Sequence, residues 1–243
     1  MLNKIAKSKW FDLFGVLIVV AISISAGYLT ENLDDVTHWG HWAMFVPFGL
    51  ISIINAGLSI MSTRLTGRLL NSGNVIGIIN TILSGTIDYL LGNKAAILTY
   101  PITFIVYVVA IKHWQNTEKY KASKPLTGIK GILTIAGIFI ATMIFSFATN
   151  YIGYQGSINS LFWLTTLIFG LSLGANILNA MKLSMQWPFW LVYNFIQLAK
   201  SLIQGNFANV GKYIYYIIAA VASLHLWTSS DKQATNTKPI AEQ

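Results

Sequence analysis

Long apolar runs separated by short polar connections dominate the hydrophobic pattern of this 243-residue chain. A helix needs about 20 apolar residues to cross roughly 30 Å of hydrocarbon, and an isolated span can satisfy its backbone groups only as a helix. The runs that approach this length are 12–30, 42–62, 71–91, 96–113, 131–151, 159–180, 187–204 and 209–227. The pattern therefore predicts an all-α integral membrane protein with eight transmembrane helices. The first run is too long for a cleaved signal peptide, and acidic residues follow it instead of a small-residue cleavage site.

Composition supports the membrane prediction and excludes several functions. The chain is 54% hydrophobic and only 10% charged, whereas ordinary soluble domains carry about 25% charged residues. Its net charge of +8 does not indicate nucleic-acid binding, because the long spans have no polar face on which to gather basic residues. The chain has no cysteine, and its eight acidic residues and four histidines are thinly spread. We therefore expect no cofactor, no metal site and no enzymatic activity.

The loop charges predict the orientation in the membrane, because cytoplasmic loops carry an excess of lysine and arginine. With the amino terminus in the cytoplasm, the cytoplasmic side collects Lys4, Lys7, Lys9, Arg64, Arg68, Lys112, Lys119, Lys121, Lys124, Lys130, Lys182, Lys232 and Lys238. The outer side keeps Lys94, Lys200 and Lys212, together with the acidic cluster Glu31, Asp34 and Asp35. We therefore expect a multi-pass protein of a bacterial inner membrane with both termini in the cytoplasm.

An internal repeat organises the spans. Residues 74–114 match 187–227 at an offset of 113, which pairs Gly92-Asn93 with Gly205-Asn206, Tyr100 with Tyr213 and Trp114 with Trp227. Upstream we expect an offset of 121, which pairs Gly49 with Gly170 and Asn55 with Asn176. Parallel repeats related by an axis along the membrane normal are a known transporter architecture, with the substrate site at the repeat interface.

The repeat and the topology divide the chain into five segments. An extra amino-terminal helix and outer loop cover 1–40, the first three-helix repeat 41–114, and a cytoplasmic loop with a linker helix 115–156. The second repeat covers 157–228, and a disordered cytoplasmic tail covers 229–243. The linker helix allows the second triplet to have the same orientation as the first. The expected plan is therefore one helix followed by a 3+1+3 bundle.

Polar residues follow a narrow stripe on the seventh span. Their spacings of three and four residues place them within about 80° of arc on one helix face; they are Trp187, Trp190, Asn194, Gln197 and Ser201. Indoles stack on flat rings, and amides offer both donors and acceptors, so the stripe is suited to a flat polar ring. The alternative is that Trp187 belongs to the interfacial aromatic belt and the amides bond a neighbouring helix.

A second stripe lies at the equivalent place on the third span and is expected to face the first. Its members are Asn74, Gly77, Thr81, Ser84 and Asp88, with Asn80 beside them. Three further groups can line the same cavity: Tyr100, Thr103 and Tyr107; Tyr213, Tyr216 and Ser223; and Asn55 with Asn176. A single asparagine in a span more often forms a hydrogen bond between helices than a contact with a ligand.

Asp88 is the one carboxylate within a repeat helix. It lies near the outer end, a turn before Gly92-Asn93-Lys94, so we interpret it as a surface acid that is solvated or paired with Lys94. The four histidines fall at helix ends or in the outer loop. The sequence therefore gives no sign of ion coupling.

The stripe residues carry a family resemblance. The segment from Trp187 to Asn194, with its W-x-x-W motif, resembles that of the PnuC family of bacterial vitamin transporters, and 74–80 resembles that family's N-x-x-G-x-x-N stretch. The resemblance covers roughly 40–228. It implies a SWEET-like bundle, a homotrimer, and facilitated uptake of nicotinamide riboside that an intracellular kinase traps by phosphorylation. It also implies substrate contacts from Trp187, Trp190, Asn194 and Asn80.

The chain departs from the family pattern at three positions. Typical nicotinamide riboside carriers have a glutamine in place of Tyr100 and asparagines near Tyr107 and Ala222. Relatives with altered pockets carry thiamine, riboflavin or deoxynucleosides, and these compounds remain alternative substrates for this chain. The expected binding set is Trp187, Trp190, Asn194, Gln197, Asn80, Ser84, Tyr100 and Tyr107.

Other functional classes make different demands. A membrane enzyme needs a nucleophile with a base, or a ligand cluster, inside one cavity, and the spans lack these. A substrate-capturing subunit of a larger transporter would bind its ligand without moving it. A channel fits less well, since bulky aromatic stripes suit a closed pocket better than an open pore.

Overall fold

The computed structural model describes residues 2–37, 40–118, 121–123, 125–156, 158–203 and 207–236, and these residues form a helical bundle. The helices are α1 (Leu2–Lys7), α2 (Lys9–Ser25), α3 (Leu33–Val36), α4 (Phe48–Gly67), α5 (Ser72–Leu90), α6 (Ala96–Gln115), α7 (Gly128–Gly153), α8 (Ser160–Ala180), α9 (Gln186–Ile203) and α10 (Phe207–Asn236). Two short 3-10 turns, η1 (Tyr28–Thr30) and η2 (His41–Phe45), flank α3. Gly205, Asn206, His38, Lys119, Lys124 and Lys238 lie outside the described residues.

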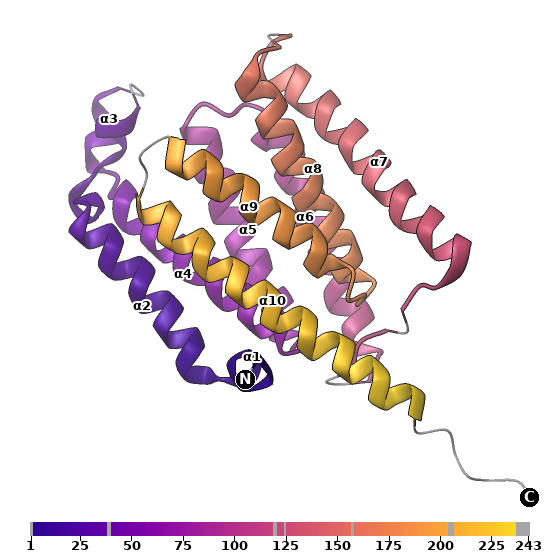
Figure 1. Cartoon of the computed structure of the whole chain (residues 1–243). Helices are drawn as coiled ribbons and strands as arrows, with labels where there is room; N and C mark the ends of the chain where they lie inside the picture. The colour runs from indigo at the N-terminus through magenta and orange to yellow at the C-terminus, as the bar shows by residue number, and fades with distance from the viewer. Residues whose placement is uncertain are drawn as a thin grey trace, which may run out of the picture.

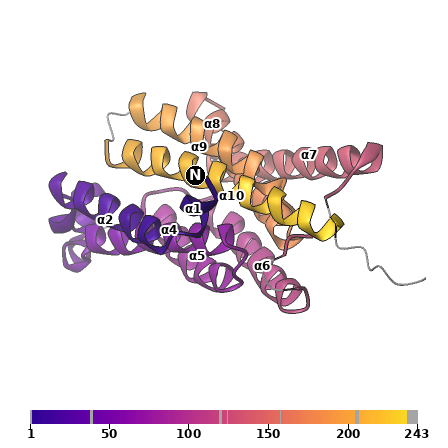
Figure 2. The same ribbon diagram turned by 60° about the horizontal axis from the view of Figure 1, so that its bottom comes forward.

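Two helix triplets make up the body of the bundle (Figures 1 and 2). Helices α4, α5 and α6 pack in succession, as do α8, α9 and α10. The triplets meet where α6 packs on α8 and where α10 packs on α4. Helix α7 lies outside α8, and α2 packs against both α4 and α10. The bundle therefore has an α1 end, with α1 and the last turns of α10, and an opposite α3 end.

Five helical segments of the described chain are long and apolar enough to cross a membrane. They are Phe48–Gly67, Ala96–Gln115, Gly128–Gly153, Phe162–Ala180 and Asn209–Ser229. The remaining long helices are α2, which has only 17 residues, and α5 and α9, which carry the two polar stripes. Those stripes lower the average apolarity, although both helices pack inside the bundle between two other spans.

The structure corrects the expected offset between the two triplets. Helix α4 ends at Gly67 and α8 at Ala180, and each is followed two residues later by a residue with positive φ, Leu69 and Lys182. These pairs keep the offset of 113, and the connections to α5 and α9 have nearly equal lengths. The offset of 121 is therefore wrong: Asn55 and Asn176 do not occupy equivalent places. Sparse identities in apolar helices gave a false register there.

The carboxyl-terminal helix is longer than expected. Helix α10 continues to Asn236, so residues 229–236, which we expected in a disordered tail, are helical. Residues 237–243 of that tail lie outside the described residues.

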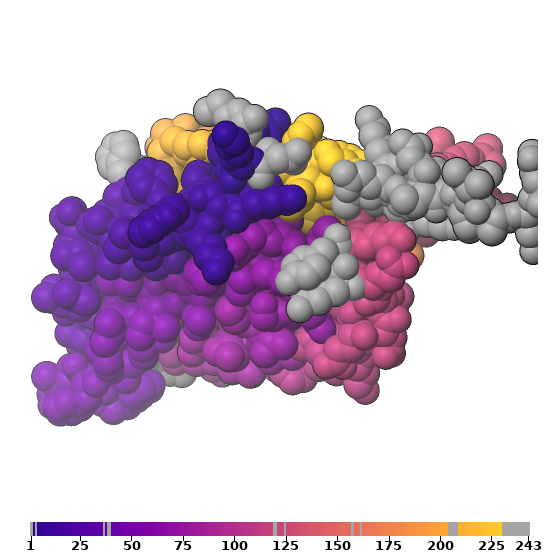
Figure 3. All heavy atoms as spheres, turned by 90° about the horizontal axis from the view of Figure 1, so that it is seen from below, coloured from indigo at the N-terminus to yellow at the C-terminus, as the bar shows by residue number. Residues whose placement is uncertain are grey.

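A buried ion cluster attaches the amino-terminal helices to the bundle. Arg64 donates through Nε to one oxygen of Asp12 (2.6 Å), and Arg68 approaches the other oxygen through Nη2 (2.5 Å). Arg64 also donates to the carbonyls of Ile5 and Ala6, at the end of α1. Arg64 is fully buried and Asp12 is 3% exposed. The cluster fixes α1 and α2 against α4 at the α1 end, where Figure 3 shows the indigo amino-terminal residues beside the yellow α10.

We predict that Asp12→Asn destabilises the protein strongly. Removal of the carboxylate charge leaves the Arg64 guanidinium buried without its counter-charge, and breaking such a pair costs about 3–5 kcal/mol. Thermal unfolding in detergent measures the loss. Asp34→Asn, at an exposed position in α3, is the matched control and is expected to keep the wild-type Tm. Equal Tm values for the two variants would contradict the structural role of the cluster.

Candidate functional site

A cavity of about 620 Å³ lies between the two triplets. Helices α4, α5, α6, α8, α9 and α10 all contribute to its wall, and α2 closes one side with Val19 and Ser23. At the α3 end the lining reaches the half-exposed Leu91 and the neighbouring Asn93. At the α1 end it stops near Trp190 and Ala220, beyond which the helices pack against one another. The cavity therefore opens toward the α3 end and is closed toward the α1 end.

Most of the expected binding residues line this cavity. Those that do are Trp190, Asn194, Gln197, Asn80, Ser84, Tyr100 and Tyr107. They come from α5, α6 and α9, so the two polar stripes do face a common space. The expected neighbours Asn55, Asn176, Thr81, Asp88, Thr103, Tyr213 and Tyr216 line it as well.

Trp187 lies elsewhere. It is 1% exposed and packs one turn of α9 below Trp190, in a buried cluster with Trp114 and Trp227. Its ring lies 5.8 Å from that of Trp227, edge to face. In this conformation Trp187 is part of the closed end of the cavity and does not belong to its wall. The stripe identified the correct face of α9 but not the point along the helix at which the cavity ends.

Amide side chains form a hydrogen-bonded group on the first triplet. Asn80 donates through Nδ2 to Oδ1 of Asn55 (2.7 Å), and Asn55 donates to Oγ of Ser84 (3.0 Å). These bonds join α4 to α5 and hold all three side chains in the cavity wall. The helix–helix role of these amides and a role in ligand binding are therefore compatible, because the bonds fix the polar groups in place.

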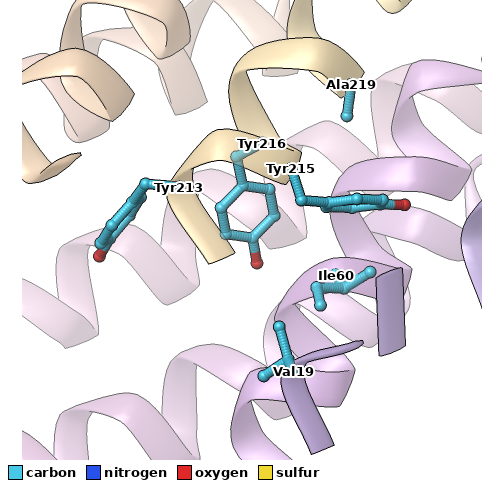
Figure 4. Packing of buried hydrophobic residues seen from close by; sticks show 6 residues of the cluster. All are labelled: Val19, Ile60, Tyr213, Tyr215, Tyr216 and Ala219. Carbon is cyan, nitrogen blue, oxygen red and sulfur yellow. The ribbon is translucent and has the colours of Figure 1, made fainter. Parts of the chain in front are cut away.

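Aromatic side chains line the opposite side. Trp190 and Tyr193 meet edge to face at 5.4 Å, and Tyr193 lies 6.4 Å from Tyr213. Figure 4 shows Tyr213 and Tyr216 extending from the same side of α10, whereas Tyr215 points away. Tyr216 donates to Ser59 on α4 (2.8 Å), which ties the wall across the two triplets. Such rigid rings can stack on a flat ligand at little cost in side-chain entropy.

Asp88 is not the surface acid that the sequence suggested. It lines the cavity, and the hydroxyl of Tyr100 donates to its Oδ2 at 2.5 Å. Lys94 makes no ion pair with it within the described part of the chain. Its position on the last turn of α5 hid this role, because an acid at the surface and an acid at the open end of the cavity have the same sequence pattern there.

Two hydrogen bonds seal the closed end. The indole of Trp114 donates to the carbonyl of Asn179 on α8 (2.9 Å), and the indole of Trp227 donates to the carbonyl of Gly67 on α4 (3.1 Å). Each bond joins the last helix of one triplet to the end of the first helix of the other. Asn179 also donates to Oδ1 of Asn74 (2.7 Å).

Lys182 supports this seal from the turn after α8. Its Nζ donates to the carbonyl of Glu118 (2.8 Å) and lies 4.9 Å from the ring centroid of Trp114. Burial lowers the pKa of this lysine, although the nearby Glu118 carboxylate acts in the opposite direction.

Apart from Asp88, the charged residues at the open end of the cavity were not expected from the sequence. Glu31 and Lys212 line the cavity, although both were counted from the sequence only as charges on the outer side of the membrane. Tyr28 and the side of α2 were likewise not expected, because the first helix was treated as an addition outside the repeats. The sequence pattern of α2 could not have revealed this contact, because its cavity-facing residues are the apolar Val19 and the single serine Ser23, which form no polar stripe.

The arrangement is one for binding. Among the described residues, no three histidine, cysteine, aspartate or glutamate side chains come together as metal ligands would. The wall combines ring faces, amides and hydroxyls in a partly enclosed space, which is the usual composition of a small-molecule site.

Comparison with known proteins gives two matches. A family described as nicotinamide mononucleotide transporter matches residues 49–229. A solved structure, the crystal structure of the vitamin B3 transporter PnuC, is similar over 96% of this chain and 96% of its own, with a TM-score of 0.66 and 16% sequence identity. At that identity the likeness is one of fold. No curated protein sequence matches the chain.

We predict that Gly85→Ala loosens the contact between α5 and α6 that positions Tyr100. A Cβ at Gly85 would come within 2.9 Å of Cβ of Tyr100, so the helices must shift. Overpacking of this kind costs about 1–3 kcal/mol. Gly137→Ala on α7, where nothing lies within 4 Å, gives the same gain in helix propensity without the clash. Thermal unfolding of both variants measures the difference, and a Gly85→Ala protein as stable as the Gly137→Ala protein would contradict this packing.

Proposed function

This chain belongs to the nicotinamide mononucleotide transporter family, and from that premise we propose that it is a facilitative carrier for the uptake of nicotinamide riboside. The protein is thus a membrane transporter and not an enzyme. The observation that carries the proposal is the cavity between two helix triplets, open toward one end of the bundle and sealed at the other. Two halves around a central site are what alternating access requires.

The proposed membrane arrangement has eight spans in the 1+3+1+3 order. Helices α2 and α4–α10 are its members, and the two triplets are parallel repeats of a SWEET-like fold. The buried contacts of α5 and α9 support their inclusion, because helices that pack between other spans tolerate polar stripes. The excess of lysine and arginine at the α1 end supports a cytoplasmic position for both termini. In this orientation the cavity opens to the outside.

The charges of the cavity favour a riboside over its phosphorylated form. The charged residues among the described lining are Glu31, Asp88 and Lys212. A phosphate group with its two negative charges is normally held by arginine or by several cationic groups, and this lining offers a single lysine beside two carboxylates. A ring and a ribose, in contrast, find aromatic faces, amides and hydroxyls.

The proposed uptake needs no energy source of its own. Phosphorylation of the riboside inside the cell adds charges that prevent its return through a cavity of this composition. The carrier therefore only has to equilibrate its substrate. We infer that the binding residues are the seven expected side chains that line the cavity, with Trp190 and Asn194 central to the site.

A second group of substrates is favoured by one observation. Tyr100 and Tyr107 line the cavity where typical nicotinamide riboside carriers have amides. This wall suits other aromatic vitamins or nucleosides, namely thiamine, riboflavin and deoxynucleosides. A capture subunit that binds without transport is the remaining alternative, and transport by the isolated chain distinguishes it.

We predict that Trp190→Ala weakens substrate binding by about 1–3 kcal/mol, which is the typical contribution of one stacked ring. Titration of the purified protein with nicotinamide riboside, thiamine, riboflavin and thymidine measures the affinity. Liposomes that contain the wild-type protein should equilibrate the bound compound without a sodium or proton gradient. Trp10→Ala, at an 80% exposed position on α2, is the control and should bind as the wild type does. Unchanged affinity in Trp190→Ala would show that the substrate does not bind against Trp190 in this cavity.

A further inference from the structure

The open end of the cavity carries a charge pattern that the proposed uptake does not itself require. Asp88 and Glu31 place two carboxylates in the described lining near the α3 end, and Lys212 contributes one ammonium group. The remaining described lining is neutral, so carboxylates outnumber cationic groups in the lining itself, although Lys200, which lies outside the lining, also acts on Asp88. A charge near a partly enclosed cavity acts more strongly than at a free surface, because less water screens it.

We propose that Asp88 makes the cavity selective for a permanently cationic aromatic ring, such as an N-alkylated pyridinium or thiazolium, over a neutral ring of similar shape. This inference rests on the proposed function and narrows its substrate class.

The geometry of Asp88 fits this role. It lies on the last full turn of α5, and the Tyr100 hydroxyl holds its Oδ2 at 2.5 Å. Tyr100 comes from the neighbouring helix α6, so the carboxylate is fixed between two helices of the same triplet. A carboxylate held in place can stabilise a cation without first losing side-chain freedom.

The aromatic wall supplies the second half of the recognition. Six tyrosines and Trp190 line the cavity; the tyrosines are Tyr28, Tyr100, Tyr107, Tyr193, Tyr213 and Tyr216. The face of an aromatic ring is negative and attracts a cation that lies within about 6 Å of its centroid. One of these rings already has a cation in place, because Nζ of Lys212 lies 4.7 Å from the ring centroid of Tyr213.

Lys212 opposes the same ligand. Its ammonium group, near the beginning of α10, lies in the same lining as Asp88 and repels a cationic ring. Removal of the Asp88 charge should therefore lower the affinity for a cation, and removal of the Lys212 charge should raise it. A change that acted only through folding or cavity shape would not produce these opposite effects.

The first test uses the wild-type protein and a matched pair of ligands. Nicotinamide riboside has a cationic pyridinium ring, and its 1,4-dihydro form is neutral with nearly the same shape. Thiamine as a second cation, and riboflavin and thymidine as neutral rings, complete the set. We expect the tightest ligand to be cationic, and where that ligand is nicotinamide riboside, its affinity to exceed that of the dihydro form by about tenfold or more.

The second test uses charge variants and the tightest cation together with the tightest neutral ligand. Asp88→Asn should lower the ratio of cation to neutral affinity by about tenfold, and Lys212→Gln should raise it. Asp34→Asn makes the same change as Asp88→Asn at an exposed site at the α3 end but outside the lining, and it should keep the wild-type ratio.

The outcomes separate the two proposals. If no compound of the set binds, the proposed function fails. If a neutral ring binds as tightly as the cations, or if Asp88→Asn keeps the wild-type ratio, the selectivity proposal fails while the carrier stands. Should Asp88→Asn not fold, the wild-type comparison and Lys212→Gln still decide: an unchanged or lowered ratio in Lys212→Gln overturns the proposal.

Discussion

The two triplets are held together at the α1 end by a pair of indole-to-carbonyl hydrogen bonds. Trp114 and Trp227 lie at equivalent places on the last helix of each triplet, and each donates to the last turn of the first helix in the other triplet. Within a bilayer, helices gain little from the hydrophobic effect, so their association depends on close packing and on hydrogen bonds of this kind. Gly67 allows the approach, since a Cβ there would meet the Ser223 side chain of α10 at 2.3 Å.

This seal explains why a polar cavity can exist beside it. The cavity lies between the triplets on the α3 side of this seal, and α2 covers one side of it, which would otherwise leave polar groups of the wall exposed to lipid. The bonds of Asn55 to Asn80 and Ser84 then keep the amides in the wall from pairing elsewhere. The seal at the α1 end, the cover by α2 and the hydrogen-bonded amides therefore belong to one arrangement. Together they provide a partly enclosed site that opens toward the α3 end.

The sequence predicted an all-α membrane protein and the helix faces on which the polar stripes lie, because these follow from apolar length and from the helical period. It could not predict how far along the cavity each side chain of the stripes lies. Trp187 and Trp190 lie on one face, yet one closes the cavity and the other lines it. Asp88 lies near a helix end, where a surface acid and a cavity acid have the same sequence pattern. Asp12 lies at the start of an apolar run, and only the fold shows that it pairs with Arg64 and Arg68.

The two ends of the cavity differ in a way that bears on transport. At the α3 end the lining includes the charged side chains of Glu31, Asp88 and Lys212 and the half-exposed Leu91, and the bonds that seal the α1 end are absent from the described residues there, so entry breaks few contacts between helices. At the α1 end, release would require the indole-to-carbonyl bonds and the contact between Asn74 and Asn179 to separate. The buried pairing of Asp12 with Arg64 and Arg68 lies at that same end, where Arg64 also holds the carbonyls of Ile5 and Ala6, so the cluster joins α1 and α2 to α4. Helices α1 and α2 also pack against α10, and the hydroxyl of Tyr215 donates to the carbonyl of Phe11 (3.0 Å). A movement of one triplet relative to the other must therefore exchange these contacts as well as the hydrogen bonds between the triplets.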